Sequence, residues 1–144
     1  MLKTGLKTYA LRDEDDEAIA TIRFNPTDPA IITRFAEAGG KIKERVDKTD
    51  IEAEPLGLNR LNEEVKGLFD YALTGNRNSH GNSDSLFAFL APTASIGEGH
   101  YYFEAVYDEI KNIIEPAIEQ SAEESEKRVS AYIDKYKPAD GGND

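Results

Sequence analysis

Side chains that could do acid–base chemistry near neutral pH are few in this chain. It contains two histidines, His80 and His100, and no cysteine. Serine and aspartate residues lie close to the first histidine in the sequence, so a Ser-His-Asp arrangement for nucleophilic catalysis can be drawn. These neighbours are Ser79, Ser83, Asp84 and Ser85. No G-x-S-x-G nucleophile elbow accompanies them, and loop histidines are more often surface groups, so we expect no catalytic site.

Metal and cofactor chemistry lacks its usual ligands. Without cysteine, disulfides and thiolate zinc sites cannot form, and two histidines are too few for a histidine-rich metal cluster. The acidic run 13–17 lacks the central glycine and the twelfth-position glutamate of a calcium loop. The Gly-Glu-Gly run at 97–99 lacks the third glycine and the lysine of a phosphate-binding loop. We therefore expect no metal and no cofactor.

The overall charge restricts the class of partner. The 144 residues include 28 acidic and 17 basic side chains, which give a net charge of −11. Such a chain repels phosphate groups, so we expect neither nucleic acid nor an anionic membrane as the main partner. No signal peptide is expected at the N-terminus, and no apolar run of about 18 residues could span a bilayer. We expect a soluble, intracellular protein.

The elements that must position any site follow from the hydrophobic pattern, which predicts one mostly α domain over residues 1–137. Residues 5–24 read as a β-hairpin, whose second strand (18–24) carries apolar side chains at every other position. The acidic run would form the exposed tip of this hairpin. Three or four helices, from residue 28 onward, then pack around one core. The acidic tail 138–144 is expected to be disordered.

The segment Ile22–Ala30 marks the change from strand to helix. Pro26 ends the strand because proline cannot donate to a β-ladder. Thr27 or Asp28 supplies a side-chain oxygen for the free amides of the first helix. Pro29 suits the first helical turn, where its missing N–H costs nothing.

Glycine and proline interrupt two of the predicted helices. The first helix has one apolar stripe, with steps of three and four residues. Its members are Ile31, Phe35, Ala38, Ile42 and Val46. Gly39 and Gly40 would weaken or bend this helix, or else allow a close contact with another helix; the sequence leaves both open. The last helix, from about Gly99 or His100, contains Pro116, which we expect to kink or divide it.

Residues 75–99 read as a loop, because glycine, asparagine and serine dominate its first part. The second helix is expected to end at Gly75. Aromatic residues bracket the loop, and they either pack onto the helices or form an exposed patch that binds a partner. The last helix continues with a sparse apolar stripe that is typical of an exposed or partner-binding surface. The candidate partner-binding residues are Phe87, Phe89, Leu90, Tyr101, Tyr102, Val129 and Ile133.

Several segments of the sequence resemble one protein family. Residues 22–35, in the form strand, Asn-Pro-x-Asp-Pro and amphipathic helix, are similar to the small tail assembly chaperones of tailed phages and prophages. The similar segments further along are Phe69–Gly75, Ser83–Phe87 and Tyr102–Pro116. None of them carries a catalytic motif.

The resemblance implies a non-enzymatic function in the host cytoplasm. Members of this family are encoded between the tail tube and tape measure genes and are absent from the finished particle. They keep the tape measure protein soluble and recruit tube subunits. The implied partners are therefore the phage tape measure protein and the tail tube protein, held through helix-in-groove contacts. Two alternatives stay open: an acidic inhibitor that imitates nucleic acid and occupies a host DNA-binding protein, and a small enzyme using His80 or His100.

Overall fold

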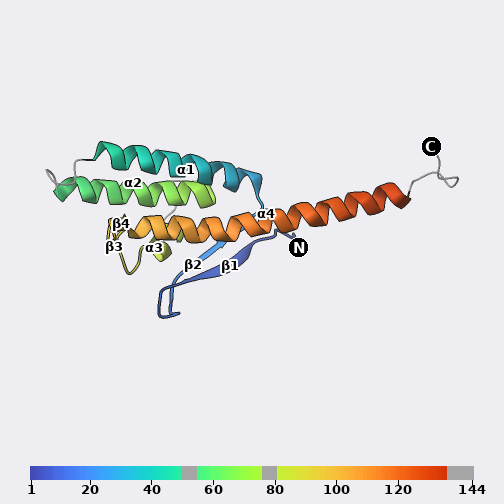
Figure 1. Ribbon diagram of the computed structural model, residues 1–144, viewed down its shortest axis with the longest axis horizontal. Helices are drawn as coiled ribbons and strands as arrows, with labels where there is room; N and C mark the ends of the chain where they lie inside the picture. Colours follow the sequence, from blue (N-terminus) through green and yellow to red (C-terminus); the bar gives the residue numbers. More distant parts are fainter. Residues whose placement is uncertain (50–54, 76–80, 136–144) are drawn as a thin grey trace.

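The computed structural model describes residues 1–49, 55–75 and 81–135; the predicted tail 138–144 and His80 lie outside these ranges. Within them the prediction of a mostly α fold with an N-terminal β-hairpin is confirmed. Three long helices run alongside one another, and the hairpin and a short helix lie below them (Figure 1). The elements are β1 (Lys7–Arg12), β2 (Ala18–Phe24), α1 (Pro29–Lys48), α2 (Pro55–Thr74), α3 (Gly81–Leu86), β3 (Ser95–Gly97), β4 (His100–Tyr101) and α4 (Tyr102–Lys135).

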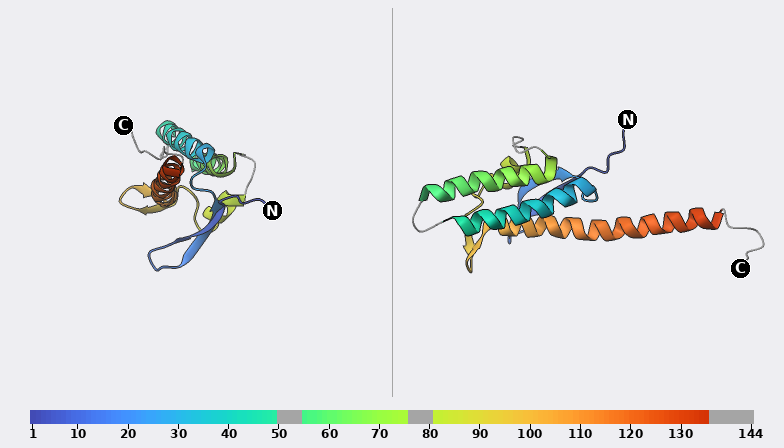
Figure 2. Two further views of the ribbon diagram at one scale, coloured as in Figure 1. Left: turned by 90° about the vertical axis from the view of Figure 1, so that its right-hand side faces the viewer. Right: turned by 90° about the horizontal axis from the view of Figure 1, so that it is seen from above.

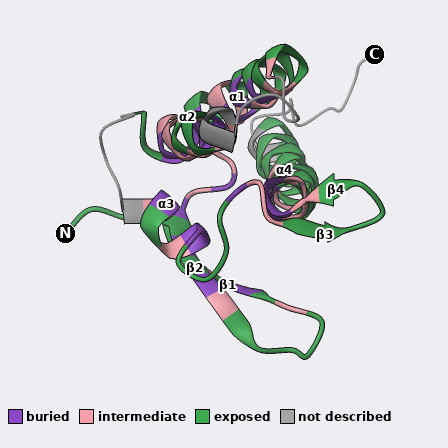
Figure 3. Ribbon diagram, turned by 90° about the vertical axis from the view of Figure 1, so that its left-hand side faces the viewer, coloured by how far each residue is buried: buried purple, intermediate pink, exposed green. Residues whose placement is uncertain are grey.

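The N-terminal hairpin pairs β1 with β2 in antiparallel register, with Tyr9 opposite Ile22. Every other residue of β2 from Ala20 onward is buried, which is the alternation that the sequence predicts. The side chain of Asp13 holds the acidic tip in its turn, because its Oδ1 accepts hydrogen bonds from the amides of Asp15 (2.9 Å) and Glu17 (3.0 Å). Figure 3 shows this tip exposed.

The strand-to-helix junction forms as predicted. Asp28 is the N-cap of α1, and its Oδ1 accepts a hydrogen bond from the Ala30 amide at 2.9 Å. Pro29 is the first residue of the helix. Thr27 is not the cap, because its amide and hydroxyl both donate to Asn25 Oδ1, at 2.9 and 2.8 Å. These bonds hold the chain in the turn that feeds α1.

One hydrophobic core joins the hairpin to all four helices. Aromatic rings form its centre: Phe69 of α2 meets Phe87 edge-on with centroids 5.4 Å apart, and Phe87 meets Tyr102 at 6.0 Å. Phe87 and Tyr102 are each 7% exposed. Of the two interpretations of the aromatic residues around the loop, packing into the core therefore holds for these two.

Helix α1 runs without interruption through Gly39 and Gly40. A Cβ atom on Gly39 would overlap the hydroxyl of Tyr107 from α4, whereas one on Gly40 would meet nothing within 4 Å. Tyr107 stacks on Phe35 with ring centroids 4.2 Å apart. Of the two alternatives for the glycine pair, the close contact is the one that the structure shows, and Gly39 alone makes it.

The predicted loop 75–99 contains two regular elements, the helix α3 and the strand β3. The buried carboxylate of Asp70, on α2, holds α3 in place by accepting hydrogen bonds from the Ser83 amide (3.0 Å) and hydroxyl (2.7 Å). Gly75 ends the preceding helix with φ +79°, and its amide donates to the Tyr71 carbonyl. Helix α3 could not be recognised from the loop-like composition of this segment. Its position depends on hydrogen bonds to Asp70, which lies 13 residues before Ser83.

Helix α4 is continuous over its 34 residues, with Pro116 inside it (Figures 1 and 2). The prediction that proline divides this helix is wrong. Proline removes one backbone donor, but its fixed φ near −65° is compatible with helical geometry. The helix begins at Tyr102, where Glu104 Oε2 accepts a hydrogen bond from the Tyr101 amide at 2.6 Å. Across the described ranges, no helix combines the length and apolar content needed to span a membrane.

Candidate functional site

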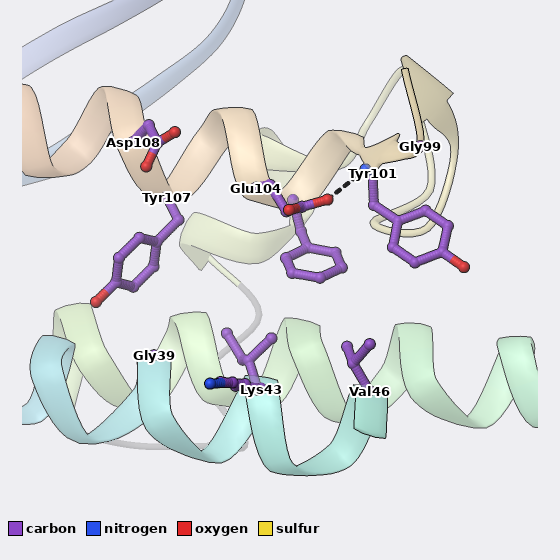
Figure 4. A pocket seen from close by; sticks show the side chains of 10 residues that line it. Gly39, Lys43, Val46, Gly99, Tyr101, Glu104, Tyr107 and Asp108 are labelled. Carbon is purple, nitrogen blue, oxygen red and sulfur yellow. Dashed lines mark hydrogen bonds between the residues drawn. The ribbon is translucent and has the colours of Figure 1, made fainter. Parts of the chain in front are cut away.

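A groove lies between the C-terminal half of α1 and the first turns of α4 (Figure 4). Its volume is about 500 Å³, and its lining is mostly apolar. The second hairpin, β3–β4, closes one end. The lining residues are Gly39, Ile42, Lys43 and Val46 from α1, Gly99 and Tyr101 from the hairpin, and Phe103, Glu104, Tyr107 and Asp108 from α4.

Tyr107 shapes the apolar side of this groove. Its ring fits over Gly39, and its hydroxyl donates a hydrogen bond to the Phe35 carbonyl at 3.3 Å. Burial, and to a lesser extent the nearby charge of Asp108, raise the pKa of Tyr107 above its ordinary value of 10.0. The ring is therefore neutral at physiological pH, and the groove presents an apolar wall there.

The charged groups of the groove stand on opposite walls, with Lys43 on α1 and Glu104 and Asp108 on α4 (Figure 4). Glu104 already has partners within the protein. Its Oε2 accepts a hydrogen bond from the Tyr101 amide, and its Oε1 lies 3.4 Å from His100 Nδ1. Within the described part of the chain, Lys43 and Asp108 make no ion pair. These two charges are available to a bound molecule.

Beyond the groove, α4 leaves the rest of the molecule. Among the residues of α4 whose burial the structure describes, Ile114 is the last buried one. Residues 115–135, which we call the arm, project past the other helices (Figure 1). Three large apolar side chains of the arm are exposed, Ile118 by 37%, Val129 by 48% and Ile133 by 58%. The arm thus displays apolar surface that no described residue of this chain covers.

The seven residues predicted to bind a partner fall in different environments. Phe87 and Tyr102 are in the core, where they support the fold and offer no surface. Phe89 (74% exposed) and Leu90 (42%) lie in the turn after α3. The other three belong to the two features described above. They are Tyr101, which lines the groove, and Val129 and Ile133, which lie on the arm.

Three of the side chains considered for catalysis lie in the described part of the chain with partners of their own. His100 is exposed and has Glu104 as its neighbour. The Ser83 hydroxyl donates to Asp70, and the Ser85 hydroxyl accepts a hydrogen bond from the Thr21 amide at 2.9 Å. The remaining candidate histidine, His80, lies outside the described residues.

Most of the groove was not predicted from the sequence. Lys43, Glu104 and Asp108 are charged residues on amphipathic helices, and in the sequence such residues look the same as any solvated helix face. Only the packing of α4 beside α1 sets them around one cavity. The four-residue spacing of the two carboxylates was a readable signal, since it places both on the same side of a helix.

Comparison with models of known protein families, with curated proteins and with solved structures gives no match to this chain. Its groove and its arm are therefore the features from which a function can be proposed.

Proposed function

We propose that this protein is a non-enzymatic assembly chaperone that binds helical segments of a long partner protein along α4. The arm is the observation that carries this proposal. An isolated helix of this size is marginal in water, and most helices gain their stability from packing an apolar face. The arm has such a face, and no described element packs against it.

The exposed apolar positions fit a partner with the same kind of surface. Amphipathic helices bind one another by laying apolar stripes into grooves, with contacts at steps of three and four residues. The arm is about 30 Å long at about 1.5 Å of rise per residue, so it can cover several turns of a partner helix. The groove beside α1 extends this contact to the body of the protein.

The segments that resemble tail assembly chaperones suggest who the partner is. A phage or prophage tape measure protein is long and largely helical, so its apolar faces need cover before the tail is built. We propose the tape measure protein as the main partner and the tail tube protein as the second. A net charge of −11 would keep a complex with such a chain soluble.

Co-expression with the tape measure protein tests this function. The source genome should encode a long helical protein, the tape measure protein, beside this gene. When that protein is co-expressed with the wild-type chain, its soluble fraction should rise severalfold. Because acidic side chains cannot be buried against an apolar face without cost, Val129→Glu with Ile133→Glu should abolish the gain.

A matched control adds the same charge on the other side of the arm, as Gln120→Glu with Ala131→Glu. This variant should protect the partner as well as the wild type does. A tape measure protein that stays insoluble with the wild-type chain, or that the first variant protects equally well, would contradict the proposal.

A further inference from the structure

Helix α4 has an eleven-residue repeat that unites the groove and the arm. Eleven residues correspond to three helical turns, so side chains at this spacing line up along the axis with little drift. Tyr107, Ile118 and Val129 follow this spacing, and Ile114 and Ser125 interleave with them on the same side. We call these five residues the stripe. It begins in the groove and ends near the tip of the arm.

A line of carboxylates follows the same repeat. Its members lie about a quarter of a turn from the stripe, at alternating steps of four and seven residues. We call it the acidic row, and it consists of Glu104, Asp108, Glu115, Glu119 and Glu126. The first two line the groove, and the other three are exposed on the arm.

The acidic row is largely unneutralised. Lys111 lies within 3.7 Å of Glu115. Among the described residues, Asp108, Glu119 and Glu126 have no ion-pair partner. Carboxylates held in a line beside an apolar surface attract a matching line of cations and repel a line of anions.

The stripe and the row form a track about 40 Å long, at about 1.5 Å per residue. At Ile114 the stripe is covered by the protein's own core, whereas Asp108 and Glu115 on either side of it are exposed. A bound helix would therefore touch apolar side chains in the groove and again from Ile118 onward. The acidic row would accompany it throughout.

We propose that this track binds one long amphipathic helix with lysine and arginine residues along the edge that meets the acidic row. The proposal rests on the function proposed above and adds the chemistry of the partner. Lys43, on the opposite wall of the groove, would face the other edge of the bound helix near one end. An acidic side chain there would complete the match.

Two synthetic helices of about 28 residues, which span about 40 Å, serve as probes. They share a leucine stripe and differ in one flanking edge, which carries lysine in the first peptide and glutamate in the second. With fluorescently labelled peptides, anisotropy titrations should show at least tenfold tighter binding of the lysine-edged peptide. A half-length version of that peptide should bind at least tenfold more weakly, because it covers only part of the track.

Charge reversal in the full-length protein locates the binding edge. Glu119→Lys with Glu126→Lys should weaken binding of the lysine-edged peptide at least tenfold and should create binding of the glutamate-edged peptide. Glu109→Lys with Glu124→Lys makes the same charge change on the opposite side of α4 and should alter affinity by less than twofold. The four substituted side chains are all exposed, so circular dichroism should show an unchanged fold.

Equal affinity for the two peptides, or equal loss in the two charge-reversed proteins, would overturn the track. These outcomes are distinguishable from failure of the chaperone function. If the lysine-edged peptide binds as described but the tape measure protein stays insoluble, the track stands and the assembly role falls. If the wild type protects that protein and the Glu119→Lys/Glu126→Lys variant does so equally, the track alone falls.

Discussion

Both halves of α4 carry an apolar stripe, dense in the first half and sparse in the second, but the two stripes lie in opposite surroundings. In residues 102–114, Val106, Ile110 and Ile114 are buried against the core. In the arm, Ile118 and Ile133 are exposed. The difference lies in the neighbours, because the other helices do not extend alongside the arm (Figure 2). An apolar stripe therefore indicates which face of a helix packs against a partner. Only the surrounding fold shows whether that partner belongs to the same chain.

Matched isoleucine substitutions should give the largest difference between the two halves. Ile110 is fully buried, and Ile110→Ala should lower the free energy of unfolding by about 3 kcal/mol, because it leaves a cavity. Ile133→Ala should change it by less than about 0.5 kcal/mol, because the side chain is exposed. Urea unfolding followed by circular dichroism measures both. Similar losses in the two variants would mean that the arm is packed in solution.

Substitutions at Gly39 and Gly40 of α1 test the contact between α1 and Tyr107, which lies in the packed half of α4 (residues 102–114). Gly39→Ala should destabilise the protein by about 1 kcal/mol or more, because the new methyl group displaces the Tyr107 ring from Phe35. Gly40→Ala should stabilise it by up to about 1 kcal/mol, since alanine favours helix and no atom lies near. Thermal unfolding should show Tm shifts of opposite sign. Two shifts in the same direction would rule out this contact.

A smaller effect should appear at high pH, and Tyr107 of the packed half should contribute to it. The pKa of Tyr107 is raised, mainly by burial, so the folded protein holds this proton more tightly than the unfolded chain does. The free energy of unfolding should therefore fall as pH rises above about 10. Tyr107→Phe should make that fall shallower, as urea unfolding at a series of alkaline pH values would show. Part of the slope should persist, because burial also raises the pKa of Tyr9 and Tyr102.

Features set by local chemistry could be predicted from the sequence. The cap at Asp28, the hairpin and the end of α2 at Gly75 each depend on residues within a few positions. Features set by distant partners could not. The hydrogen bonds between Asp70 and Ser83 fix the position of α3, and no periodic pattern in the sequence predicts these bonds.

The same distinction applies to the candidate site. Exposure at Val129 and Ile133 followed from a sparse stripe on a charged helix. The groove was missed because its walls belong to α1 and α4, whose contact depends on the missing side chain at Gly39. Sequence patterning described each helix face separately and could not say which faces meet.

Pro116 stands where α4 leaves the core, two residues after Ile114. Because proline has no N–H, the carbonyl of Asn112 has no helical donor, and its exposed position lets water take that place. Bending at this turn consequently strains one backbone hydrogen bond fewer than bending elsewhere in the helix. The root of the arm is thus its most compliant point, and the arm can tilt as a rigid rod to follow the curvature of whatever it holds.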